Sequence, residues 1–366
     1  MIPMPNSLSH AVLADRIFDG HRWHLGAALM IREGRIAGLG SWGEVPPDWP
    51  QARMPAEAFL APGFIDLQVN GGGGLLLNDQ PTADTMRAIA RAHRRYGTTA
   101  CLTTLISDTR DQLRSANTAA RSVAGRDGVL GDLEQLCELG GAGGSMVTLA
   151  PECVPAGFVP TLAAEGVRVS IGHSEAPAAL VMQAVADGAS GVTHLFNAMA
   201  PLSARAPGII GAALADERLT AGLILDGLHV DPISVRAAFA AKGGEGIALV
   251  TDAMPTVGAA LNRFELMGQT IKLADGRLTT EAGTLAGAHL DMASAVRNAV
   301  KLCEISLESA LRAASLTPAQ FLGLDSERGT LAPGARADFV ALTQELIPVS
   351  TWIDGSVNEM ASDSRE

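Results

Sequence analysis

The sequence predicts an α/β protein whose main body is a parallel (β/α)8 barrel of the TIM type. Three observations predict this fold. Short apolar runs alternate with helix-like stretches over residues 61–330, which is the order of repeated βα units. The runs are continuously apolar, which is typical of strands covered on both faces. Polar residues gather where the runs end, and barrels of this class carry their chemistry at the carboxyl ends of their strands.

Seven strands are predicted from runs that end in polar or glycine residues. The runs lie at 63–71, 99–107, 146–152, 167–174, 191–198, 221–229 and 246–254. Helix-like stretches such as TADTMRAIARAHRRYG and PAALVMQAVADGAS separate them. Such barrels typically take about 250 residues, so seven strands in this region indicate an eighth that is not evident. A doubly wound open sheet is the alternative, although no G-x-G-x-x-G motif opens a first helix.

The third strand is the one missing from this pattern. Between the runs at 99–107 and 146–152, two helix-like stretches flank only the short VLG at 129–131. A barrel without one strand would leave unpaired backbone groups and an open edge. We therefore expect that a segment near 131–132 is missing from the chain or unrecorded in its sequence.

The two ends of the chain have a different character. Residues 1–60 and 331–366 contain short strand-like runs and turns, such as HAVLADRIFDG and ADFVALT. Neither segment alone is long enough for a stable domain. We expect the two to combine into one small β-rich domain beside the barrel at 61–330.

Composition argues against several classes of protein. The net charge of −12 disfavours non-specific binding to nucleic acid or to an anionic membrane. No apolar run is long enough to span a bilayer, and the N-terminus lacks the pattern of a signal peptide. The four cysteines (Cys101, Cys137, Cys153 and Cys303) form no C-x-x-C pair, which is typical of reduced thiols in a cytoplasmic protein.

Two histidines follow consecutive predicted strands, His173 in IGHSEA and His194 in GVTHLFNAM. Neutral imidazole is a common metal ligand, and two such side chains can meet above one barrel rim. The alternative is that each is an ordinary packed or surface histidine. Catalytic zinc usually takes three protein ligands, so this pair alone leaves the ligand set incomplete.

Other polar residues at the strand ends suggest further roles. Asp252 in LVTDAM is placed to act as a general base and then as an acid, or else to cap a helix. His229 and Asp226 in LDGLHVD either contact substrate or brace their loop. Arg205, in the loop LSARAPG, is a candidate for binding an anion or an ordinary surface side chain.

Several motifs in order along the chain resemble one family. They are APGFIDLQVNGGGG, TLAPE, GHSEA, THLFNAM, DGLHVD, LVTDAM and GTLAGAHLDM. Together they resemble the N-acetylglucosamine-6-phosphate deacetylases of the amidohydrolase superfamily, from about residue 10 to the C-terminus. The resemblance implies a barrel with a small β-sandwich made by both chain ends. It also implies hydrolysis of the acetamide of a phosphorylated amino sugar by a homodimer.

The resemblance also implies roles for individual residues. His173 and His194 would bind one divalent metal ion, zinc or alternatively iron or another divalent ion, and Asp252 would be the acid and base. Arg205 and His229 would bind the phosphate, in a site completed across the dimer interface. The full set of substrate contacts implied is Asn197, Ala198, Arg205, His229, Leu285, Ala286 and Gly287.

The chain departs from the family pattern in two places. Many superfamily members have His-x-His after the first strand, where this chain has Gln68 and Asn70; this favours one metal ion over two. The family's third strand ends in a glutamate ligand, and that strand is the missing one. Glu134 and Glu138 lie in a helix-like run, so neither is expected to replace this ligand, whereas Glu152 at the end of the next strand is a possible substitute. Alternative functions are therefore hydrolysis of another small amide, or sugar-phosphate binding without catalysis by a protein that has lost its metal.

Overall fold

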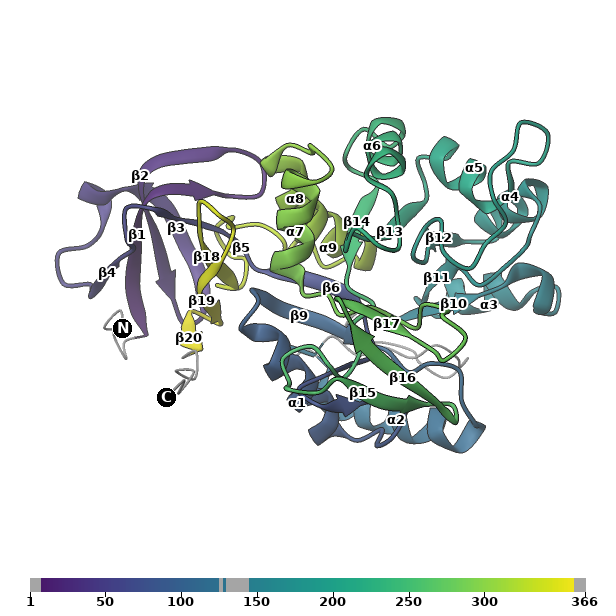
Figure 1. Cartoon of the computed structure of the whole chain (residues 1–366). Coiled ribbons are helices and arrows are strands. Elements are labelled where there is room, and N and C mark those ends of the chain that lie inside the picture. The colour runs from purple at the N-terminus through teal and green to yellow at the C-terminus, as the bar shows by residue number, and fades with distance from the viewer. Residues whose placement is uncertain (1–7, 125–127, 130–144, 359–366) are drawn as a thin grey trace.

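The computed structural model describes residues 8–124, 128–129 and 145–358. Each of the seven predicted runs overlaps a strand. The first two strands pair in parallel with each other, and the last five pair in parallel in chain order. The strands are β6 (Phe64–Val69), β9 (Thr98–Thr103), β10 (Met146–Leu149), β11 (Arg168–Ile171), β12 (Ala189–Val192), β13 (Thr220–Ile224) and β14 (Ile247–Val250). The predicted α/β fold with a parallel barrel is confirmed, and Figure 1 shows these strands beside a separate sheet.

Isolated parallel bridges join the first strand of this series to the last and add a short segment beside β9. Val69, at the end of β6, forms a parallel bridge with Ala253, which follows β14, and so joins the first strand to the last. Val129 forms a parallel bridge with Cys101 of β9, and the Cys101 N–H donates to the Gly128 carbonyl over 2.9 Å. The short VLG run therefore starts in the place of a third strand. The predicted break near 131–132 lies outside the described residues.

Helices follow the barrel strands and bury apolar side chains against them. In α1, for example, the Thr82 hydroxyl caps the first turn by accepting from the Thr85 N–H, and Met86 and Ile89 are buried. The described helices are α1 (Ala83–Arg94), α2 (Arg110–Val123), α3 (Phe158–Ala164), α4 (Ala178–Ala186), α5 (Gly208–Ala215), α6 (Pro232–Ala241), α7 (Met292–Lys301), α8 (Leu307–Ala314) and α9 (Leu316–Leu322), with 3-10 turns η1 (Trp42–Glu44) and η2 (Pro151–Cys153). None of the helices in these described ranges is long and apolar enough to cross a membrane.

Strands from both ends of the chain share one eight-stranded sheet (Figure 1). The two ends meet where β5 pairs antiparallel with β18. Its strands are β1 (Ser9–Phe18), β2 (Trp23–Arg32), β3 (Arg35–Ser41), β4 (Gln51–Arg53), β5 (Ala58–Pro62), β18 (Phe339–Thr343), β19 (Pro348–Ile353) and β20 (Ser356–Asn358). This sheet is the small β domain expected of the two termini, while domain limits at residues 60 and 330 remain a prediction.

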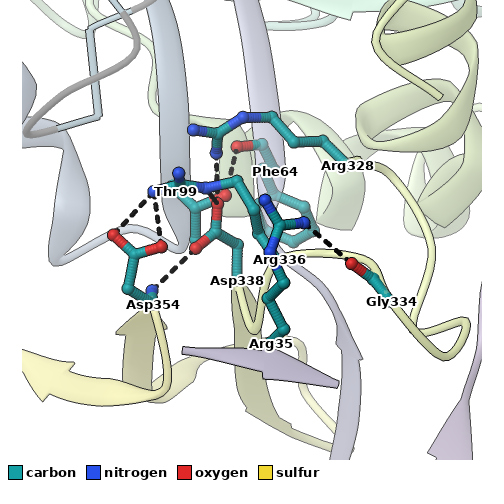
Figure 2. A network of polar contacts seen from close by, with 8 residues as sticks. All are labelled: Arg35, Phe64, Thr99, Arg328, Gly334, Arg336, Asp338 and Asp354. Atoms are coloured by element: carbon teal, nitrogen blue, oxygen red, sulfur yellow. Dashed lines mark hydrogen bonds and ion pairs between the residues drawn. The ribbon is translucent and has the colours of Figure 1, made fainter. Parts of the chain in front are cut away.

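A buried polar network lies where the small sheet meets the barrel (Figure 2). Arg328 and Asp338 form a buried ion pair, and Arg336 bridges Asp338 to Asp354. The Asp338 carbonyl also accepts from the N–H of Gly63, the residue before β6. The network thereby fixes the first barrel strand relative to the terminal sheet.

Two small antiparallel sheets were not predicted. The hairpin of β7 (Gly71–Gly72) and β8 (Leu75–Leu76) follows β6, and the segment after β14 forms β15 (Arg263–Leu266), β16 (Gln269–Ala274) and β17 (Arg277–Thr279). Leu285, just after β17, pairs with Thr279, and Ala286 donates to the Leu278 carbonyl. The three-stranded sheet thus carries the predicted substrate-contacting stretch 285–287.

Candidate active site

His173 and His194 meet at the carboxyl ends of adjacent strands. Each follows its strand by two residues, and their Nε2 atoms lie 2.9 Å apart. His194 is buried, whereas His173 remains exposed to solvent. The surrounding protein lowers the pKa of both histidines, by full removal of water at His194 and by partial removal at His173, where His194 adds to the effect. A lowered pKa favours the neutral imidazole that binds metal ions. The predicted convergence of these two side chains is therefore present in the structure.

Asp252 projects from the same rim, two residues beyond β14. Its Oδ1 accepts from Nδ2 of Asn70 over 2.7 Å and from Nε2 of Gln68 over 2.8 Å. Burial raises the pKa of Asp252, and the hydrogen bonds from the amide donors oppose that rise. The alternative role as a helix cap is wrong, because no helix in the described part of the chain begins at this residue.

The backbone is strained at the residues that converge on this rim. His173, His194 and Asp252 all have positive φ, at 49°, 32° and 50°. Ala198, a predicted substrate contact, has φ of 51°. Left-handed backbone costs a non-glycine residue about 1–3 kcal/mol and clusters at functional sites. The strain therefore supports a functional role for this rim independently of residue type.

A second carboxylate, Asp66, lies beneath Asp252. It is fully buried and accepts from the Thr251 hydroxyl over 2.5 Å and from the Gln68 N–H over 3.1 Å. Burial raises the pKa of Asp66 to about 7, although these hydrogen bonds oppose the shift. No role was predicted for Asp66 from the sequence. The signal that was available is the D-x-Q-x-N alternation, which places Asp66, Gln68 and Asn70 on one face of a strand.

Asp226 both braces its loop and orients His229. Its Oδ2 lies 2.6 Å from Nδ1 of His229, and its Oδ1 accepts from the N–H groups of Leu228 and His229. His229 is close enough to the rim that its charge lowers the pKa of both His194 and Asp252. Asp226 and His229 can therefore both brace their loop and contact substrate, because the contact with Asp226 uses Nδ1 of His229 and leaves its Nε2 for a ligand.

The other predicted substrate contacts divide into two groups. Ser174, next to His173, donates its N–H to the Ala198 carbonyl, and the Asn197 N–H donates to the His194 carbonyl. Ala288 donates to the Asp252 carbonyl, which brings the stretch Leu285, Ala286 and Gly287 to the same rim. Gly287 is required there, because a Cβ at this position would lie 2.4 Å from Met254. Arg205, by contrast, is exposed in its loop, and no hydrogen bond or ion pair within the described ranges joins it to this group.

The two histidines fit part of a metal site. Across the described residues, no group of three or more His, Cys, Asp or Glu side chains could hold a metal ion. Glu152 does not complete one, since its carboxylate accepts from the Ser174 hydroxyl and the Glu175 N–H and so braces the loop of His173. Glu134 and Glu138 lie outside the described residues.

The chain belongs to the amidohydrolase family, whose model matches residues 59–357. Its relatives in that family are deacetylases of phosphorylated amino sugars. The N-acetylgalactosamine-6-phosphate deacetylase of a Shewanella species is 38% identical over 92% of this chain and 93% of its own length. The N-acetylglucosamine-6-phosphate deacetylase of Haemophilus influenzae is 31% identical over 82% and 86%. These matches confirm the resemblance drawn from the motifs.

A solved structure shows the same architecture. The N-acetylglucosamine-6-phosphate deacetylase of Pasteurella multocida superposes with a TM-score of 0.90 at 29% identity, over 96% of this chain and all of its own. The Shewanella match spans 368 aligned positions, more than the 366 residues of this chain, although only 92% of the chain takes part. That relative therefore contains residues with no counterpart here.

Proposed function

We propose that this chain hydrolyses the acetamide of N-acetylglucosamine 6-phosphate, giving glucosamine 6-phosphate and acetate. The observation that carries the proposal is the rim itself, where two neutral imidazole nitrogens 2.9 Å apart and the oriented carboxylate of Asp252 lie together. Relatives that cover most of this chain carry names for this chemistry. A non-catalytic sugar-phosphate-binding protein would have no need to keep these three strained residues.

Asp252 is the residue placed to transfer protons. Its Oδ1 is occupied by two amide donors, which leaves Oδ2 to accept a proton from the attacking water. The same proton then passes to the departing amine nitrogen as the carbon–nitrogen bond breaks. Its raised pKa suits this double role, because an acid with a very low pKa would return the proton poorly.

His173 and His194 would bind a divalent metal ion, zinc or alternatively iron or another divalent ion. Such an ion supplies Lewis-acid polarisation of the acetamide carbonyl or activation of water. The lowered pKa of both imidazoles and the approach of their Nε2 atoms support this role. The intact mass of the purified protein tests the ligand set. A mass above that of 366 residues would show that the protein contains an additional segment, and that segment would be the source of a third ligand.

We further propose that His229 and Arg205 bind the 6-phosphate, with Arg205 reaching across a homodimer interface. The exposure of Arg205 and its lack of an ion-pair partner in the described ranges support this role. Mixing Arg205→Ala and Asp252→Asn subunits tests it. If Arg205 acts across the interface, mixed dimers regain one intact site, and each variant alone stays inactive at low substrate concentration. Mixtures with no recovered activity would place Arg205 in its own subunit's site or outside any site.

Acetate release from the phosphorylated and the unphosphorylated sugar tests the function. We expect turnover of N-acetylglucosamine 6-phosphate and a much lower kcat/KM for N-acetylglucosamine, since the latter lacks the anchoring group. No release from either sugar, even with added zinc, would overturn the proposal. Equal rates on both would point to the alternative of another small amide.

The galactose epimer is a second candidate substrate. One specific observation favours it, because the relative at 38% identity is named for N-acetylgalactosamine 6-phosphate. The two sugars differ only in the configuration at C4, so the same acetamide and phosphate contacts serve both. The ratio of kcat/KM for the two epimers, measured with one enzyme preparation, decides which is preferred.

A further inference from the structure

The first barrel strand presents two carboxamides to the last one. Because side chains alternate along a strand, Gln68 and Asn70 share a face of β6 and its end. Both are buried, at 8% and 2% exposure. They meet Asp252, which lies more than 180 residues further along the chain. This contact joins the two strands that close the barrel.

Both carboxamides donate to the same oxygen of Asp252. Nδ2 of Asn70 and Nε2 of Gln68 lie 2.7 Å and 2.8 Å from Oδ1, so two N–H donors occupy that oxygen. Oδ2 accepts no hydrogen bond within the part of the chain that the structure describes. The two oxygens of this carboxylate are therefore not equivalent, and one rotamer is fixed.

The backbone of β6 holds the same residue. The Asp252 N–H donates to the Gln68 carbonyl over 3.0 Å, and the Asn70 N–H donates to the Ala253 carbonyl over 3.0 Å. Asp252 also has a positive φ, a conformation that persists only where the surrounding structure imposes it. Side-chain and backbone contacts from one strand together impose it here.

We propose that Gln68 and Asn70 are positioning residues that aim Oδ2 of Asp252 at the reacting acetamide. They orient the carboxylate through hydrogen bonds from neutral donors, without the full positive charge that a lysine or arginine would bring. Gln68 and Asn70 therefore do more than occupy the positions where other superfamily members have metal-binding histidines: they orient the carboxylate of Asp252. The inference rests on the deacetylase function proposed above.

Near-isosteric apolar variants test the proposal. Gln68→Met and Asn70→Leu each remove one donor and keep most of the side-chain volume. We expect kcat to fall about ten- to a hundredfold in each, the usual effect of losing a hydrogen bond to a charged group, and further in the double variant. KM should stay within about twofold, and zinc per chain, measured after dialysis against a fixed zinc buffer, should match the wild type.

If the apolar variants do not fold, the isosteric Gln68→Glu and Asn70→Asp replace donors by acceptors and should lose at least as much activity.

The matched control is Gln183→Met, which removes an exposed carboxamide donor to the Asp187 carboxylate on α4 rather than to Asp252 and should leave kcat unchanged. Wild-type kcat in the double variant would overturn the proposal. A fall in kcat that follows a loss of bound zinc would also overturn it, because the carboxamides would then belong to the metal site. Wild-type protein that releases no acetate would instead overturn the proposed function and, with it, this role.

Discussion

Two carboxylates in this protein, one buried and one partly buried, have opposite surroundings. Asp338, at the junction of sheet and barrel, is paired with the guanidinium groups of Arg328 and Arg336 (Figure 2). Asp252, at the barrel rim, receives only neutral amide donors from Gln68 and Asn70. A cationic partner stabilises the ionised carboxylate by full Coulombic attraction, whereas an amide donor stabilises it through a hydrogen bond and also fixes its direction. The comparison indicates that Asp338 serves the fold and Asp252 the chemistry.

The largest effect expected from this difference is on turnover. Asp252→Asn keeps the shape of the side chain but removes the proton acceptor, so kcat should fall by about 10²–10⁴-fold. Thermal unfolding should change little, because the asparagine can still accept through its carbonyl oxygen. Steady-state kinetics and substrate binding by calorimetry check both points. Turnover close to that of the wild type would show that another group carries the proton.

The second prediction concerns stability rather than turnover. Asp338→Asn leaves the buried Arg328 without a charged partner, and breaking a buried pair in this way costs about 3–5 kcal/mol of unfolding free energy. Chemical denaturation measures the loss, while kcat per folded molecule should be unchanged. Asp354→Asn is the matched control in the same network; its carboxylate is 53% exposed, so about 1 kcal/mol or less is expected. Equal losses in the two variants would contradict the assignment of Asp338 to the fold.

The strands and rim residues of the site could be predicted from the sequence, whereas the contacts between their side chains could not. Continuous apolar runs located seven strands, because burial on both faces leaves a local signal. The same runs placed His173, His194 and Asp252 on one rim, since parallel strands end together. The contact of Gln68 with Asp252 could not be predicted, because periodicity shows the face of a strand and not which distant side chain meets it. The small sheet β15–β17 was missed for a different reason: its strands are short and largely exposed, so burial imposes little pattern on them.

Asp66 combines features of Asp252 and Asp338, and its substitution is expected to have the smallest effect, on the pH dependence of the unfolding free energy. Like Asp252 it has only neutral donors, but it is fully buried, and its pKa in the folded protein is raised to about 7. A carboxyl group whose folded pKa exceeds its unfolded value binds its proton more tightly in the native state. Its contribution to stability is therefore complete below about pH 4 and is lost as the pH rises through about 7.

Asp66→Asn removes this titration and keeps an acceptor for the Thr251 hydroxyl. Between pH 6 and pH 8 the unfolding free energy of the wild type should fall about 1 kcal/mol more than that of the variant. Urea unfolding of both proteins across this range measures the difference, and titrations elsewhere in the chain cancel between them. Parallel curves would mean that Thr251 and the Gln68 N–H stabilise the ionised carboxylate as fully as a cation would. In that case neutral donors alone would hold a buried charge, and the contrast between Asp252 and Asp338 would rest on geometry rather than on charge.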